Sequence, residues 1–221
     1  MSNLFQSFDP SSSLGLSIQW ISSFMFILMI LPLFWVLPNR SNLIINMFFQ
    51  WTHEEFKSIL GKNYFNITLL GSTFMLFIMM NNFMGLFSYI FTSSSHLVMT
   101  LSLALPFWFA LMLFGWMNKT VEMLAHTLPM STPVILMPFM VLVETISNFI
   151  RPITLAVRLA ANMIAGHLLL TLLGNQGNTN FMIYSLVLTS QLLLITLESA
   201  VALIQSYVFA TLTMLYSSEI C

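Results

Sequence analysis

Two hydrophobic segments in the last third of the chain are each too long for one upright membrane-spanning helix. Residues 134–173 run for 40 positions and residues 181–216 for 36, with only the polar loop 174–180 between them. Helices of these lengths would measure about 60 and 54 Å at about 1.5 Å per residue, whereas the hydrocarbon core of a bilayer is about 30 Å thick. Each segment must tilt strongly, bend or divide into two helices. No turn residues interrupt 181–216, which favours a strongly tilted hairpin.

Three further apolar segments meet the requirement of about 20 residues for a membrane-crossing helix. They are residues 14–37, 67–91 and 97–117. Residues 43–60 differ, because polar side chains recur there at three- and four-residue steps, which favours an amphipathic helix in the membrane interface over a solvated loop helix. The sequence therefore predicts an all-α polytopic membrane protein. We expect one membrane domain (1–221) with about five crossing helices and one interfacial helix.

The composition agrees with lipid as the main solvent of the chain. Of the 221 residues, 58% are hydrophobic and 6% are charged, whereas soluble domains carry about 25% charged residues. The net charge of −1 provides no basic patch for nucleic acid. The single cysteine, Cys221, excludes an internal disulfide framework. No His, Cys and Asp spacing indicates a metal site.

The positions of Lys and Arg predict the orientation, because these cations favour the inner side of a membrane. Arg40, Lys57 and Lys62 follow the first apolar segment, and Lys119 follows the third. All four lie on one side if the chain crosses five times, with the N-terminus outside and the C-terminus inside. The N-terminal residues lack the cations of a signal or transit peptide. Abundant Phe and Met with scarce Lys and Arg is typical of a protein made inside an animal mitochondrion, where inside means the matrix.

Charged side chains within the last two apolar segments point to a function. Each charge near mid-membrane costs about 2.5–3.5 kcal/mol on insertion scales. Glu144, Arg151 and Arg158 are spaced seven residues apart, which places them within about 40° on one helix face. Asn162 flanks that face, and His167 lies on the opposite one. Mutual ion pairs that hold helices together are the structural alternative, above all for Glu144 and Arg151.

The second long segment carries a polar face of its own. Gln191, Glu198 and Gln205 are also seven residues apart, and Glu219 continues the series beyond Leu212. Two facing polar seams can enclose water, and acids and a histidine along them can relay protons if their pKa values are shifted. An arginine cannot, because its pKa is above 12. A fixed cation between two relays therefore divides the path into two halves.

The predicted orientation assigns the ionisable groups to these halves. Glu144 lies toward the inner side, because its segment starts there. His167 and Glu198 share the outer half. Arg158 lies between the two groups.

The stretch IRPITLAVRLAANMIAGHLLL (150–170) closely resembles the signature of subunit a of F-type ATP synthases, in its animal mitochondrial form. The resemblance covers essentially the whole chain, including ETISNFIRP, NNFMGLFSYIFT, SLALPFW and ESAVALIQSYVFATLTMLY. It implies a non-catalytic, proton-conducting subunit of the mitochondrial inner membrane, with no cofactor or metal. The implied partners are the rotating c-subunit ring, the peripheral stalk, other membrane subunits and the lipid bilayer, while ATP is handled elsewhere in the complex.

The resemblance also implies roles for individual residues. Arg158 would face the carboxylates of the ring and prevent protons from bypassing rotation. Protons would enter an outer half-channel at His167, Glu198 and Asn162, and would leave toward the matrix past Glu144. The full set implied for the proton path is Arg158, Glu198, His167, Glu144, Asn162, Gln205 and Arg151.

Two other classes of function could use the same charges. A secondary transporter or a respiratory-complex subunit is one, but transporters usually show internal repeats with paired broken helices, and no repeat is visible in this sequence. A purely structural membrane scaffold is the other. The scaffold hypothesis predicts that Arg158→Lys, which keeps the charge, leaves proton flux intact.

The remaining features have ordinary interpretations. Gly166 and Ala161 can let a neighbouring helix approach closely, with the c-ring as the candidate neighbour. His53 and His96 are interpreted as loop or interface residues. His126 is interpreted as an interfacial, structural residue, with a minor role in the matrix exit as the alternative.

Overall fold

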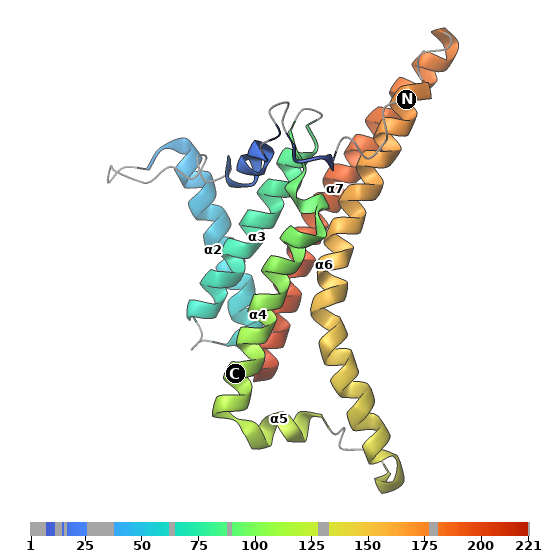
Figure 1. The fold of residues 1–221 in the computed structure, drawn as a ribbon. Helices are drawn as coiled ribbons and strands as arrows, with labels where there is room; N and C mark the ends of the chain where they lie inside the picture. Colours follow the sequence, from blue (N-terminus) through green and yellow to red (C-terminus); the bar gives the residue numbers. More distant parts are fainter. Residues whose placement is uncertain are drawn as a thin grey trace.

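A computed structural model describes residues 8–11, 15, 17–25, 38–61, 65–87, 90–127, 133–176 and 181–220. Within these ranges the chain is helical and contains no strand. Four helices are long and apolar enough to cross a membrane (Figure 1): α3 (Phe65–Gly85), α4 (Leu97–Asn118), α6 (Met137–Gln176) and α7 (Phe181–Ile220). The predicted all-α polytopic membrane class is therefore confirmed.

Shorter helices complete the described part of the chain. The helix α2 (Arg40–Leu60) precedes the four long helices, and α5 (Thr120–His126) lies between α4 and α6. Three short 3₁₀ helices are η2 (Ile18–Phe24), η3 (Ser93–Ser95) and η4 (Val134–Leu136). Most of the predicted first span, 14–37, falls outside the described residues, so the total of five crossings stays a prediction.

Each of the two long C-terminal helices is continuous over 40 residues. The division of either segment into two helices is thereby excluded. The helix α6 continues through Pro152, and Pro138 lies in its first turn, where no backbone hydrogen bond is lost to proline. At about 1.5 Å per residue each helix is about 60 Å long, so it fits a bilayer only with tilt or curvature. Figure 1 shows α6 beside α7 and leaning away from α4 toward its N-terminal end.

A central apolar core joins the four long helices. Leu155, Ala156 and Leu159 present one face of α6 to this core and are at most 6% exposed. They pack with Ile78 of α3, Ala104 of α4 and Phe209 of α7. This packing fixes which face of α6 points inward and which points away from the bundle.

Small polar residues of α7 are buried within the bundle. Ser206 and Ser217 have 0% exposed surface. Their hydroxyl groups donate 2.7 Å hydrogen bonds to the carbonyl oxygens of Leu203 and Met214 in the same helix. Small side chains at an interface let membrane helices approach closely. These serines therefore serve packing and are satisfied within α7.

The helix α2 packs on the bundle through its C-terminal half. Phe56 is fully buried in a cluster with Met75 of α3 and Met214 of α7. In the N-terminal half Ile44 and Met47 are about 70% exposed (70% and 68%), and Figure 1 shows this half leaning away from α3. The helix itself therefore matches residues 43–60, while its position in the membrane interface stays a prediction.

Candidate functional site

Arg158 lies on the face of α6 that points away from the bundle. Its side chain is exposed, whereas Leu155 and Leu159 are buried in the core. Among the described residues it has no ion-pair or hydrogen-bonding partner. A charged group on a membrane-crossing helix is stable only beside a polar, anionic or hydrated neighbour. The outward face of α6 therefore requires a partner at this level.

Small side chains surround Arg158 on the same face. Thr154, Ala161 and Ala165 are exposed and lie four residues before it and three and seven residues after it. These offsets place them close to the direction of Arg158 on a helix. Small residues let another helix approach the backbone closely. This face of α6 therefore combines the permanent charge of Arg158 with side chains small enough for a neighbouring helix to pack against it. This arrangement agrees with the prediction that Ala161 lets a neighbouring helix approach closely.

Glu198 is buried between α7 and α6 and is only 4% exposed. It lies so close to Gly166 that a Cβ atom added there would come within 2.6 Å of the carboxyl carbon Cδ. The neighbour that Gly166 accommodates is thus Glu198 of α7. Both carboxyl oxygens are buried and have no hydrogen-bond partner among the described residues. A buried carboxylate without a hydrogen-bond partner is costly, so this carboxyl group must either be protonated or be hydrogen-bonded to water.

His167 lies beside Gly166 and hence at the same level of the bundle as Glu198. Its imidazole is hydrogen-bonded to the backbone of Gly85 at the end of α3. The ring of Phe8 meets it edge-on, with the ring centroids 6.3 Å apart. The Nε2 atom is buried and has no partner in the described ranges. The structure thus places the two groups that the sequence assigned to the outer half at one level of the bundle, with no hydrogen bond between them among the described residues.

Two contacts establish the register between the antiparallel helices α6 and α7. Gly166 meets Glu198, and the guanidinium carbon of Arg151 lies 5.4 Å from the centre of the Tyr216 ring. Arg158 is about halfway between Arg151 and Gly166 along α6. Because antiparallel partners step in opposite directions, it lies level with the midpoint of Glu198 and Tyr216 on α7.

That midpoint is Tyr207, and Gln205 lies two residues away from it. Gln205 and Asn162 are both partly buried, and Asn162 is one helical turn from Arg158 toward the outer group. No hydrogen bond joins either amide to Arg158 in the described part of the chain. The register therefore brings Gln205 and Arg158 to about one level of the bundle.

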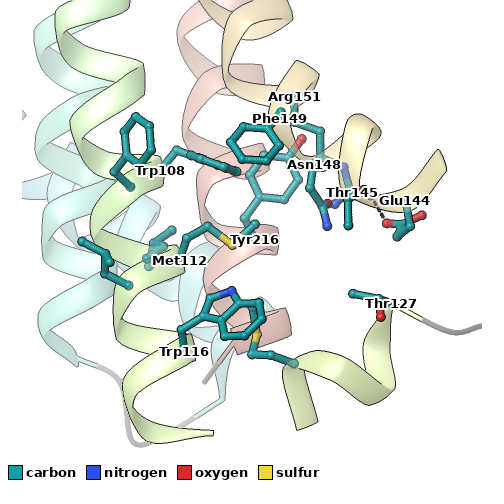
Figure 2. A pocket seen from close by; sticks show the side chains of 14 residues that line it. Trp108, Met112, Trp116, Thr127, Glu144, Thr145, Asn148, Phe149, Arg151 and Tyr216 are labelled. Atoms are coloured by element: carbon teal, nitrogen blue, oxygen red, sulfur yellow. Dashed lines mark hydrogen bonds and ion pairs between the residues drawn. The ribbon is translucent and has the colours of Figure 1, made fainter. Parts of the chain in front are cut away.

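A cavity of about 450 Å³ lies between α4, α5, α6 and α7 at the end of the bundle away from Glu198. Figure 2 shows its two unlike walls: polar side chains from α6 face aromatic and methionine side chains from α4. The polar wall includes Glu144, Thr145, Asn148 and Arg151, and the apolar wall includes Trp108, Met112 and Trp116. Such a lining can hold water along one side only.

Glu144 and Arg151 form an ion pair in this cavity, with Nη2 of Arg151 3.4 Å from Oε1 of Glu144. The mutual pairing that the sequence left open for these two residues is thus observed. Their side chains are 36% and 32% exposed, so the pair faces the cavity and does not join two packed helices. Arg158, two turns further along α6, takes no part in it.

Sequence comparison identifies the family. The family described as ATP synthase A chain matches residues 16–218. The chain belongs to this family. Curated relatives named ATP synthase subunit a include those of Anopheles quadrimaculatus, Drosophila simulans and Locusta migratoria, which are 58%, 57% and 57% identical. Each alignment covers 100% of this chain and 99% of the relative. The resemblance seen in the sequence is therefore confirmed.

One polar region of this family member was not assigned a role from its sequence. Asn81, Asn82 and Ser94 each carry a buried polar atom without a hydrogen-bond partner among the described residues. They line a small cavity of about 10 Å³ beside Leu159 of α6, close to the minimum volume for one water molecule. The signal that could have found them is the occurrence of NN and SSS next to apolar segments, where unpaired polar groups are costly.

Proposed function

We propose that this chain is the proton-conducting stator subunit of a rotary F-type ATP synthase in the mitochondrial inner membrane. The observation that carries the proposal is the exposed Arg158 on the outward face of a membrane-crossing helix, where it has no ion-pair or hydrogen-bonding partner within the described ranges. Membership of the ATP synthase A chain family supports it. The subunit itself performs no catalysis, and ATP is made elsewhere in the complex.

The two polar regions on either side of Arg158 would act as offset half-channels. The outer one contains His167, Glu198 and Asn162, and the inner one is the cavity that holds Glu144. Arg158 is eight residues from Gly166 and 14 from Glu144, or roughly 12 and 21 Å along the helix axis. No other charged residue of α6 lies between Arg151 and the outer group.

Two separate half-channels can pass protons across the membrane only if a moving group carries each proton from one to the other. One proton that crosses the membrane potential releases about 2.3 kcal/mol per 100 mV. A continuous water path would dissipate this energy as leak. If Arg158 blocks direct passage, each proton must cross on a carboxyl group of a partner that moves past the outward face of α6. The c-subunit ring is that partner, and the small residues Thr154, Ala161 and Ala165 allow its helices to approach.

The other proposed residues act around this barrier. Gln205, level with Arg158, would help to orient the guanidinium group. Arg151 would hold Glu144 at the inner cavity through their ion pair. The N-terminus would face the intermembrane space and the C-terminus the matrix. Exposed apolar side chains elsewhere, such as Leu113 and Phe114 of α4, would contact lipid, the peripheral stalk or other membrane subunits.

The test is Arg158→Lys in the assembled complex, compared with Arg40→Lys at the exposed start of α2. Lysine keeps a charge but is a poorer obligate cation, because it can lose its proton when desolvated. We expect normal assembly, loss of coupled ATP synthesis and altered passive proton leak for Arg158→Lys, and no change for Arg40→Lys. Full ATP synthesis in the Arg158→Lys complex would favour the scaffold hypothesis and reject the proposal.

A further inference from the structure

His96, at the junction of η3 and α4, anchors the N-terminal segment of the chain. Its Nε2 atom lies 2.9 Å from the backbone oxygen of Phe8, and because a carbonyl oxygen only accepts, Nε2 is the donor. The imidazole packs in a three-ring cluster with Trp20 and Phe91, whose ring centroids are each 5.2 Å from it and 5.5 Å from each other. The backbone oxygen of His96 accepts hydrogen bonds from the first turn of α4. His96 is therefore fixed by its backbone to the start of α4.

Phe8 connects this anchor to the outer half of the proposed proton path. Its backbone is held by His96, while its ring meets His167 edge-on at 89°. The same imidazole is hydrogen-bonded to the backbone of Gly85. In Figure 1 the blue N-terminal segment lies at the end of the bundle where α3 ends and α4 begins. The imidazole of His167 is thus held between the end of α3 and a segment tied down by His96.

We propose that His96 is a positioning residue of the outer half-channel, which keeps the ring of Phe8 as a cover on His167. The inference rests on the proposed function, because it deepens the role of His167 in that half-channel. A proton acceptor must present its nitrogen in a fixed direction, since proton transfer requires hydrogen-bond distance. The cover limits rotation of the imidazole and excludes water from one of its sides. Protons then reach the buried nitrogen by one route.

Two substitutions at His96 separate the hydrogen bond from the packing. His96→Phe keeps a ring in the cluster with Trp20 and Phe91 but removes the donor to Phe8. His96→Gln keeps a donor in the side chain and loses the ring. Phe8→Ala removes the cover and leaves His96 in place. If His96 served only to pack its aromatic neighbours, His96→Phe would be the milder of its two substitutions.

The first measurement is the rate at which diethyl pyrocarbonate modifies His167 in the complex, in membranes with the outer side exposed. Mass spectrometry would follow His167 and His53 together, with His53 of α2, which is hydrogen-bonded to Thr68 of α3, as the reference histidine. For His96→Phe we expect His167 to react roughly fivefold faster, the factor that corresponds to one net hydrogen bond. Phe8→Ala keeps that hydrogen bond but removes the ring itself, so His167 should react at least as fast in this variant. His96→Gln should stay close to the parent, and His53 should react equally in all variants.

The second measurement is coupled ATP synthesis by the same membranes. His96→Phe and Phe8→Ala should both lower it, and the double variant should be no slower than Phe8→Ala, because the two residues act through one contact. Unchanged modification of His167 in both variants would overturn the inference. Faster modification with unchanged synthesis would also overturn it, because the cover would then have no part in proton transfer. Neither result touches the proposed function, which fails only if the Arg158→Lys complex retains full synthesis.

Discussion

Gly166→Ala is predicted to displace the carboxyl group of Glu198 and thereby slow proton entry. A Cβ atom at this position would lie 2.6 Å from Cδ and 3.1 Å from Cγ of Glu198. Carbon atoms at optimal contact are about 3.5–4.0 Å apart, so the side chain must retreat by about 1 Å or the two helices must separate. Overpacking of this kind costs typically 1–3 kcal/mol.

The functional effect should exceed the effect on stability. Misplacement of a reacting group by about 1 Å can reduce a rate on the order of 100-fold. We therefore expect Gly166→Ala to assemble with a modest loss of thermal stability and to lose most of its coupled ATP synthesis. The assays are native gel electrophoresis for assembly and proton-driven ATP synthesis in membrane vesicles for function.

Gly174→Ala is the matched control on the same helix. A Cβ atom there would lie 3.4 Å from Nε2 of Gln191, which is close to ordinary contact, so synthesis should be nearly unchanged. Glu198→Asp in the Gly166→Ala background withdraws the carboxyl group by one methylene and should restore part of the rate. If Gly166→Ala behaved like Gly174→Ala, the argument from the Gly166–Glu198 contact would be refuted.

Three further predictions test other parts of the structure. Glu198→Gln preserves the shape of the side chain, but the glutamine amide cannot take up a proton, so proton flux should fall strongly in a normally assembled complex. Unchanged proton flux would show that Glu198 is not in the outer half-channel. Glu144→Gln breaks a partly exposed ion pair, which contributes at most about 1 kcal/mol to stability. ATP synthesis should therefore fall while the melting temperature of the complex stays nearly constant. If ATP synthesis and melting temperature fell together, the ion pair would have a structural role. Ser206→Leu adds volume at a fully buried position of α7, so the complex should lose about 1–3 kcal/mol of stability and assemble poorly on native gels. Thr196→Leu at an exposed position of α7 is the control, and equal assembly of the two variants would contradict the close packing around Ser206.

The position of His96 shows how a local interpretation can miss a longer connection. From its sequence neighbours it is an interface residue, and that description agrees with its aromatic surroundings. Its hydrogen bond, however, reaches Phe8, 88 residues earlier in the chain. No spacing within a segment predicts such a contact, because it depends on where Phe8 lies in the folded bundle.

The sequence by itself determined the membrane class, the long helices and the candidate residues of the proton path. Apolar length is a local property, and a polar residue within an apolar segment is costly wherever the helix packs. For the same reason, seven-residue spacing was enough to place Glu144, Arg151 and Arg158 on one face, and the ion pair of the first two agrees with that face.

Only the tertiary structure decided what each face meets. Periodicity orients side chains relative to their own helix, but not relative to a neighbour whose register and distance depend on packing along the whole interface. That is why the sequence could suggest the c-ring as the neighbour of Gly166, whereas the structure puts Glu198 there. The outward direction of Arg158 follows from the same packing, because burial of Leu155 and Leu159 in the core turns the arginine away from the bundle.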